Sequence, residues 1–197
     1  MSLFCQLATL KRRLDIATSE TADDTILTNA IKAVSARFNK HCNRVFDRTA
    51  SAIYEFDADL KFILPPCYPV ESVASWHLKD NETDGWVAQT GVEYLLRKNG
   101  AVLELVTPLG TAAQIAKVTY TGGYVLPGTT PSGSQTALPD DIEQAAVEQC
   151  VYWFQNRNRL GITSASGEGA SVSQFADLDL LPSVRGALEA HKRIVAF

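Results

Sequence analysis

The sequence predicts an α+β protein, in which helices at the two ends of the chain form a bundle around an inserted antiparallel β subdomain. The spacing of the apolar residues changes twice and carries this prediction. Up to about residue 46, and again from residue 139, they follow a helical repeat, whereas in between they alternate or form short runs, as in strands. The predicted divisions are N-terminal helices over 1–49, the β subdomain over 50–125, a loop over 126–138, and C-terminal helices over 139–197 with a flexible loop at 161–180.

Two helices are predicted before residue 50. The first carries a single apolar stripe, formed by Leu3, Leu7, Leu10 and Leu14. The second begins near Thr21 and Asp24, which resemble a capping box with Asp in place of the usual Glu. Its stripe consists of Leu27, Ile31, Val34 and Phe38, and Val45 could extend it.

Six or seven strands are predicted in the middle of the chain, over 51–56, 61–64, 70–78, 86–88, 94–98, 102–106 and 115–120. Asn99-Gly100 separates two of them and favours positive φ angles, which predicts a hairpin with a type I′ turn. Because all the connections are short, the sheet should be antiparallel.

Helical spacing returns at Pro139, which opens a helix together with Asp140 and Asp141. Proline is tolerated in the first turn, and the two acids favour the positive end of the helix dipole. The predicted apolar face consists of Ile142, Ala146, Cys150, Trp153 and Phe154, and Gly161 is a plausible stop. A last helix follows Leu181-Pro182 and carries Val184 and Leu188 on its apolar side.

Composition is that of an ordinary globular protein, with 46% hydrophobic and 20% charged residues. Eighteen basic and 22 acidic residues give a net charge of −4, which argues against a protein that grips DNA through a basic face. It does not exclude one that lets DNA pass. The first residues lack the order of a secretory signal and no stretch is apolar enough to span a membrane, so we expect synthesis in the cytoplasm.

No catalytic, metal or cofactor site is predicted. The sequence lacks a Gly-rich phosphate loop and a Gly-x-Ser-x-Gly elbow. The residues that could carry chemistry are spread over separate segments. The cysteines are interpreted as buried thiols: Cys5, Cys42, Cys67 and Cys150. The histidines are interpreted as surface residues (His41, His77 and His191), and the acid pairs as helix or turn starts (Asp23-Asp24, Asp57/Asp59, Asp140-Asp141 and Asp177/Asp179). Basic clusters at 11–13, 157–159 and 192–193 complement the ends of predicted helices, with a charged protein interface or a phosphate contact as the alternative.

Four segments taken together resemble tailed-phage head–tail connector (adaptor) proteins: TLKRRLDI over 9–16 with the helix after Ala22-Asp23-Asp24, KVTYTGGY over 117–124, LPDDIEQA over 138–145 with Trp153, Arg157 and Arg159, and LLPSVRGAL over 180–188. The resemblance implies a non-enzymatic ring, often twelvefold, below the portal of the DNA-filled head. Such a ring extends the DNA channel and receives the stopper or tail. The long β region, residues 50–124, departs from the smaller, mostly helical members and points to a longer form.

This resemblance implies the partners and the location. The expected partners are the portal protein, a stopper or tail-completion protein, and further copies of the chain in a ring that is dodecameric when assembled. DNA is expected to pass without sequence-specific binding, and no membrane or cofactor is expected. The location is the virion neck of a phage or prophage, after synthesis in the bacterial host. The apolar C-terminal end is the predicted portal or ring contact, formed by Arg185, Lys192, Arg193, Ile194, Val195 and Phe197. Truncation after Ala190 should abolish portal binding and leave the fold.

Three alternatives stay open. The first is another neck or tail-completion protein, such as a tail terminator on the tail tube. The second is an enzyme that uses His77 with Asp57 or Asp59. The third is a ligand-binding module built on Trp76, Trp86 and Tyr94.

Overall fold

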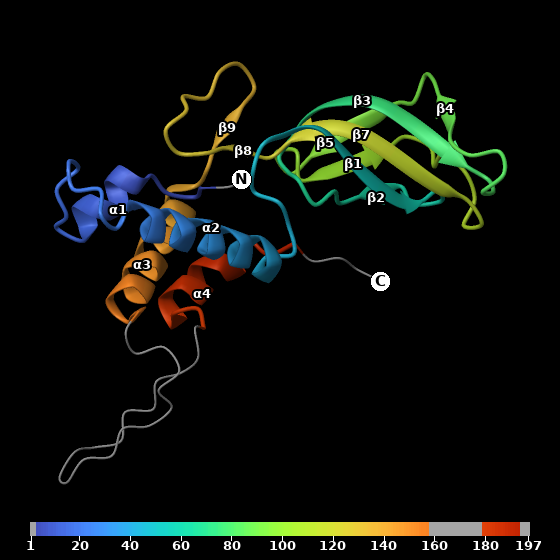
Figure 1. Cartoon of the computed structure of the whole chain (residues 1–197). Helices are drawn as coiled ribbons and strands as arrows, with labels where there is room; N and C mark the ends of the chain where they lie inside the picture. The colour runs from blue at the N-terminus through green and yellow to red at the C-terminus, as the bar shows by residue number, and fades with distance from the viewer. Residues whose placement is uncertain (1–2, 158–178, 194–197) are drawn as a thin grey trace, which may run out of the picture. The chain divides into compact units, whose positions relative to one another are not determined.

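The computed structural model describes residues 3–157 and 179–193, in which the chain forms two compact units. The first, here called the helical unit, comprises Met1–Phe38 and Pro139–His191; the second, the β unit, comprises Asn39–Leu138 and Lys192–Phe197 (Figure 1). This mixture of helices and antiparallel sheets confirms the predicted α+β class. The bundle arrangement and the domain boundaries of the sequence analysis stay predictions. The proposed flexible loop at 161–180 lies almost entirely outside the described residues.

Four helices lie in the described part of the chain: α1 (Leu7–Arg13), α2 (Asp24–His41), α3 (Asp140–Gln155) and α4 (Pro182–Glu189). The stripes predicted for α2 and α4 are buried as expected. On α3, Trp153 is half-buried, whereas the other predicted positions are buried. The first helix is shorter than its leucine stripe, because Leu3 precedes it and Leu14 caps it.

Val45 does not extend α2, contrary to the sequence prediction. The helix ends at His41, and Asn43 adopts a left-handed φ of 49°. The amides of Asn43 and Arg44 donate to the carbonyls of Lys40 and Asn39, at 3.3 and 3.1 Å. This is the pattern of a Schellman C-cap, which turns the chain away from the helix axis. Val45 instead forms a parallel bridge with Cys67.

The β unit contains two antiparallel sheets. The larger has the strand order β1 (Thr49–Asp57), β7 (Ile115–Gly122), β3 (Val70–Lys79) and β4 (Val87–Gln89). The smaller has the order β2 (Phe62–Ile63), β6 (Val102–Leu105) and β5 (Tyr94–Arg97). Their inner faces share one hydrophobic core, so the two sheets form a sandwich (Figure 1).

A third, two-stranded sheet corrects the prediction of a single antiparallel sheet followed by a loop. Strands β8 (Tyr124–Val125) and β9 (Thr136–Ala137) pair in parallel, and the Leu138 amide donates to the Val125 carbonyl at 2.9 Å. Residues 126–138 therefore contain a short strand. A ladder of two residues is too short to show alternation, so the Gly-, Thr- and Ser-rich composition gave no sign of it.

The Asn99-Gly100 hairpin is confirmed. Both residues have positive φ, 54° and 79°, and the Ala101 amide donates to the Lys98 carbonyl at 3.2 Å, as in a type I′ turn. Gly100 also lies against β3, because its carbonyl accepts from the Val70 amide at 2.8 Å. The turn thus connects the smaller sheet to the larger one.

Four free cysteines are buried in the described residues. In the same part of the chain, no helix combines the length and the apolar character that crossing a membrane requires.

Candidate assembly surfaces

The predicted C-terminal contact residues are divided between the two units and the residues that the structure does not describe. Arg185 lies on α4 in the helical unit, where it forms an exposed ion pair with Asp179. Lys192 and Arg193 belong to the β unit. Ile194, Val195 and Phe197 lie outside the described residues. The role of this set in portal binding stays a proposal.

Arg193 is held by the β unit itself. Its Nε and Nη2 donate to the Leu64 carbonyl at 2.9 and 2.5 Å, and Nη2 also donates to the Tyr54 hydroxyl at 3.0 Å. Its backbone amide donates to the Cys42 carbonyl at 2.8 Å. A guanidinium with these partners holds the start of the C-terminal segment on the β unit.

In the helical unit, the buried side chain of Gln149 makes hydrogen bonds to the backbone directly before α4. The Gln149 amide group donates to the Asp179 carbonyl at 3.2 Å and accepts from the Leu181 amide at 2.9 Å. At the other end of α4, the His191 imidazole lies 2.7 Å from an Asp141 oxygen at the start of α3. These contacts pin both ends of the last helix to α3 and so define where the C-terminal segment leaves the helical unit.

Of the basic cluster at 11–13, Lys11 is committed to local structure. It is 3% exposed, and its ammonium lies 2.5 Å from an Asp24 carboxylate oxygen and 2.5 Å from the Glu20 carbonyl. It therefore pairs with the Asp24 carboxylate in the first turn of α2 and is not placed to bind phosphate. Arg12 and Arg13 are exposed.

Sequence reasoning missed Arg44, a cation 4% exposed in the β unit. Its guanidinium carbon lies 3.4 Å from the Tyr68 ring centre, 4.4 Å from that of Phe46 and 5.2 Å from that of Tyr124. It also donates to the Tyr68 carbonyl. Aromatic faces attract a desolvated cation strongly, so Arg44 is a packing residue of the fold and not a surface contact.

The outer face of the smaller sheet carries an exposed apolar patch, here defined as Phe62, Leu95 and Val106. Phe62 and Leu95 flank Glu104 in the strand register, and the Val106 amide continues the ladder by donating to Glu93. Their exposed fractions are 55%, 48% and 51%. Alternate residues of the same strands, such as Ile63 and Leu103, enter the core, so the patch faces away from it.

Two cations share one carboxylate at the centre of this patch. Arg97 Nε lies 2.7 Å and Lys61 Nζ 3.7 Å from Glu104 oxygens. The hydrogen bond from Arg97 holds the pKa of the Glu104 carboxyl below its ordinary value, so Glu104 is charged at neutral pH. The patch centre therefore carries one surplus positive charge.

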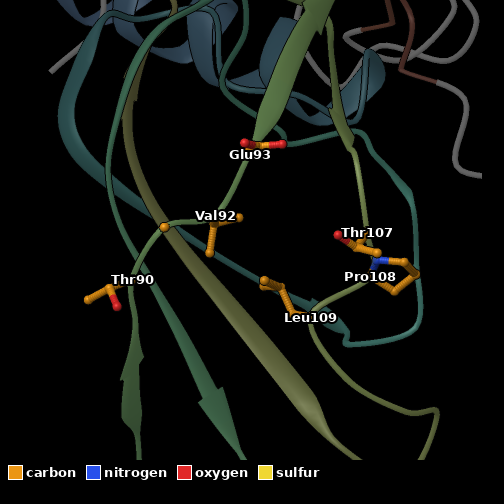
Figure 2. Close-up of a pocket in the computed structure, with 7 residues that line it drawn as sticks. Thr90, Val92, Glu93, Thr107, Pro108 and Leu109 are labelled. Atoms are coloured by element: carbon orange, nitrogen blue, oxygen red, sulfur yellow. The ribbon is translucent and has the colours of Figure 1, made fainter.

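A shallow hollow of about 230 Å³ lies beside the patch, between the loops that follow β4 and β6. Figure 2 shows its lining: Thr90, Gly91, Val92, Glu93, Thr107, Pro108 and Leu109. Glu93 is its single titratable side chain, and small polar and apolar groups supply the rest. The exposed lining is mainly polar, unlike the largely apolar and aromatic lining of a typical small-molecule site.

The outer face of the larger sheet carries a second surface, here called the acidic stripe: Ile53, Glu55 and Asp57 on β1, with Ile115 opposite Asp57 on β7. All four are exposed. Neither Glu55 nor Asp57 forms an ion pair among the described residues. Lys117 and Lys79, which lie on the same face, instead approach the Trp86 ring centre at 4.2 and 5.0 Å.

The residues of the enzyme alternative do not come together. Asp57 is on β1 and His77 is on β3, and β7 lies between these strands. Two strand spacings of about 4.8 Å therefore separate them, beyond the reach of a proton transfer. No cluster of metal-ligating side chains occurs in the described ranges.

The aromatic residues of the ligand-binding alternative are split between two faces. Trp76 is 5% exposed and packs against Tyr94, with 5.8 Å between ring centres, in the core. Trp86 instead covers the lysines of the outer face. They form no common platform for a ligand.

Exposed apolar residues on both outer faces of the sandwich, in the described part of the chain, are typical of a protein that binds other proteins. A family model for the head completion protein matches residues 6–194. The chain therefore belongs to the head completion protein family. This membership confirms the resemblance to head–tail connectors and the structural role in a virion that the sequence predicts.

Solved structures share the fold over nearly the whole chain. The structure described as "Neck of empty GTA particle computed with C6 symmetry" matches 100% of this chain and 95% of its own, with a TM-score of 0.59 and 15% identity. "Neck of native GTA particle computed with C12 symmetry" matches 100% and 94%, with a TM-score of 0.57 and 14% identity. "Virion of native gene transfer agent (GTA) particle" matches 98% and 92%, with a TM-score of 0.57 and 15% identity. No curated protein matches the sequence.

Proposed function

We propose that the chain is the subunit of a closed ring in the neck of a tailed phage or prophage, below the portal. The observation that carries this proposal is the head completion family match over residues 6–194. The likeness over the whole chain to neck structures treated with sixfold and twelvefold symmetry supports the ring. A ring is the closed assembly that a single subunit type builds around a channel.

The ring extends the DNA channel without reading sequence. The chain carries a net charge of −4, and its described basic cluster at 11–13 has Lys11 committed to α2. A protein that neutralises few phosphates binds DNA weakly, since counterion release supplies most non-specific affinity. DNA therefore moves through such a ring with little drag. The role is structural and involves no catalysis, cofactor or metal.

The C-terminal segment contacts the portal in this proposal. Arg193 anchors the segment. The contact candidates are those of the sequence analysis: Arg185, Lys192, Arg193, Ile194, Val195 and Phe197. The truncation after Ala190 that the sequence analysis suggests would also remove Arg193 and its hydrogen bonds to the β unit. A truncation after Arg193 is the sharper variant, because it removes the apolar end and keeps the hydrogen bonds to Leu64 and Tyr54.

Electron microscopy of the purified protein mixed with the portal protein of its genome tests the proposal. The expected result is an added ring on the narrow end of the portal. The truncation after Arg193 should lose this ring and keep the thermal unfolding midpoint of the full chain. Rings on isolated tail tubes, with none on the portal, would replace this function by that of a tail terminator.

A further inference from the structure

We infer that neighbouring copies of the chain contact each other through the two outer faces of the β sandwich, the apolar patch of one copy meeting the acidic stripe of the next. The inference rests on the proposed ring and names the surfaces that close it. Both surfaces belong to the β unit, and one hydrophobic core fixes the position of one surface relative to the other.

Their placement suits a ring. A head-to-tail contact requires two different surfaces that lie on opposite sides of the subunit. The patch lies on the outer face of the β2–β6–β5 sheet and the stripe on that of the β1–β7–β3–β4 sheet, and the inner faces of these sheets pack together (Figure 1). A two-fold dimer would instead use one surface that matches itself.

Each surface exposes a large apolar side chain that does not contribute to the core. Phe62 on the patch is 55% exposed and Ile53 on the stripe is 61% exposed. Each sits in a strand whose alternate residues, including Ile63 and Phe56, are buried in the sandwich. An aromatic anchor near the centre of a partly charged surface is the composition typical of a protein interface.

The two surfaces offer one complementary pair of charges, Asp57 on the stripe and Arg97 on the patch. Glu55 and Asp57 are exposed and form no ion pair among the described residues. Lys117 lies opposite Glu55 in the strand register, whereas Asp57 lies opposite Ile115, so Asp57 is the carboxylate that lacks a cation on the adjacent strand. On the patch, Arg97 and Lys61 share Glu104, and only Nε of Arg97 bonds to it, so the guanidinium retains further donors. Glu93 lies at the Val106 end of the patch and Arg97 at the opposite end, while Phe62 is level with Glu104 between them. The Arg97 end is the one that fits the Asp57 carboxylate of a neighbour.

Three matched variants test the inference. Phe62→Glu alters the patch, Ile53→Glu alters the stripe, and Val87→Glu is the control, since Val87 is 55% exposed on β4 and belongs to neither surface. Each variant is first checked by circular dichroism for the fold of the full chain. Self-association is then measured by analytical ultracentrifugation, and ring formation by electron microscopy with the portal protein.

The expected result is a roughly tenfold or larger loss of association for Phe62→Glu and for Ile53→Glu, the effect of losing one central anchor, with Val87→Glu unchanged. An equimolar mixture of Phe62→Glu and Ile53→Glu should form dimers and no rings. Each variant alone stays monomeric, whereas the mixture retains one intact patch and one intact stripe. Association should also weaken as salt is raised.

The failures are distinguishable. If the unaltered chain forms rings and all three variants do so equally, the inference is overturned and the proposed function stands. If the mixture forms no dimer although the unaltered chain assembles, the two surfaces do not meet and the inference is again overturned. If the unaltered chain assembles neither alone nor on the portal, the proposed function fails and this inference with it.

Discussion

At the scale of single residues, Arg193 has the clearest structural consequence. Its guanidinium makes hydrogen bonds to Leu64 and Tyr54 that span the sequence from residue 54 to residue 193. Arg193→Ala should lower the free energy of unfolding of the β unit by about 2 kcal/mol, the typical worth of hydrogen bonds to a charged group. Trp76 and Trp86 fluorescence reports this unit in urea titrations, once Trp153 is replaced by Phe. Thr130→Ala, at an exposed loop position of the same unit, is the control and should change this free energy by less than about 0.5 kcal/mol.

Tyr120 gives a pH-dependent prediction. Burial raises the pKa of its hydroxyl well above the ordinary value of 10, and the hydroxyl accepts from the Cys67 amide at 3.1 Å. Because the folded state holds the proton more tightly, stability is full below pH 10 and falls as the pH rises further. Tyr120→Phe should remove part of this alkaline loss and cost about 1–3 kcal/mol at neutral pH, since the Cys67 amide loses its acceptor. Urea midpoints at pH 7 and pH 11 check both effects, and an unchanged alkaline slope in the variant would contradict the assignment.

At the scale of elements, the turn at Gly100 connects the two sheets. A Cβ at Gly100 would lie 2.8 Å from the Val70 carbonyl oxygen, whereas a Cβ at Gly91 would meet nothing within 4 Å. Both residues have positive φ, at 79° and 69°, so Gly91→Ala measures the backbone cost alone, about 1 kcal/mol. Gly100→Ala should cost clearly more, by about 1–3 kcal/mol, because the hairpin must also move from β3. If the two variants lose the same free energy of unfolding in urea titrations, the close packing of Gly100 against Val70 does not contribute to stability.

Local patterns predicted the elements, and long-range contacts decided what the patterns left open. The stripe from Leu27 to Phe38 and the Asn99-Gly100 turn depend on neighbours in sequence, so periodicity and turn chemistry were sufficient. The end of α2 depends on Asn43, whose left-handed backbone the apolar periodicity does not indicate. The role of Arg193 depends on Leu64, 129 residues away, which no spacing rule can reveal.

The candidate surfaces show the same division. Strand alternation predicts that Phe62 is exposed only if the next residue, Ile63, is known to be buried against a second sheet. The sequence analysis predicted one sheet, so it had no outer face on which to place this residue. It therefore assigned assembly to the charged and apolar C-terminal end.

At the scale of the whole molecule, the order of segments distinguishes the two units. The helical unit needs both ends of the chain, whereas Asn39–Leu138 is continuous and contains all the buried residues of the sandwich core. A continuous insertion with its own core is expected to fold alone. The fragment 39–138 should therefore give a dispersed amide spectrum in NMR. A helical fragment 1–38 should give none, since its stripe has no partner.

The expected stability of fragment 39–138 can be calculated from the effect predicted for Arg193→Ala. It lacks Arg193, so its free energy of unfolding should fall short of that of the β unit in the full chain by about the 2 kcal/mol expected for Arg193→Ala. The comparison separates two origins of stability, because a larger shortfall would mean that the rest of the chain supports the sandwich as well. Urea titration of the fragment beside the full-length Arg193→Ala variant, both followed by Trp76 and Trp86, gives the two values on one scale. Agreement between them would make Arg193 the principal thermodynamic link from the C-terminal segment to the β unit, and an unfolded fragment would show that the unit depends on the helices for its fold.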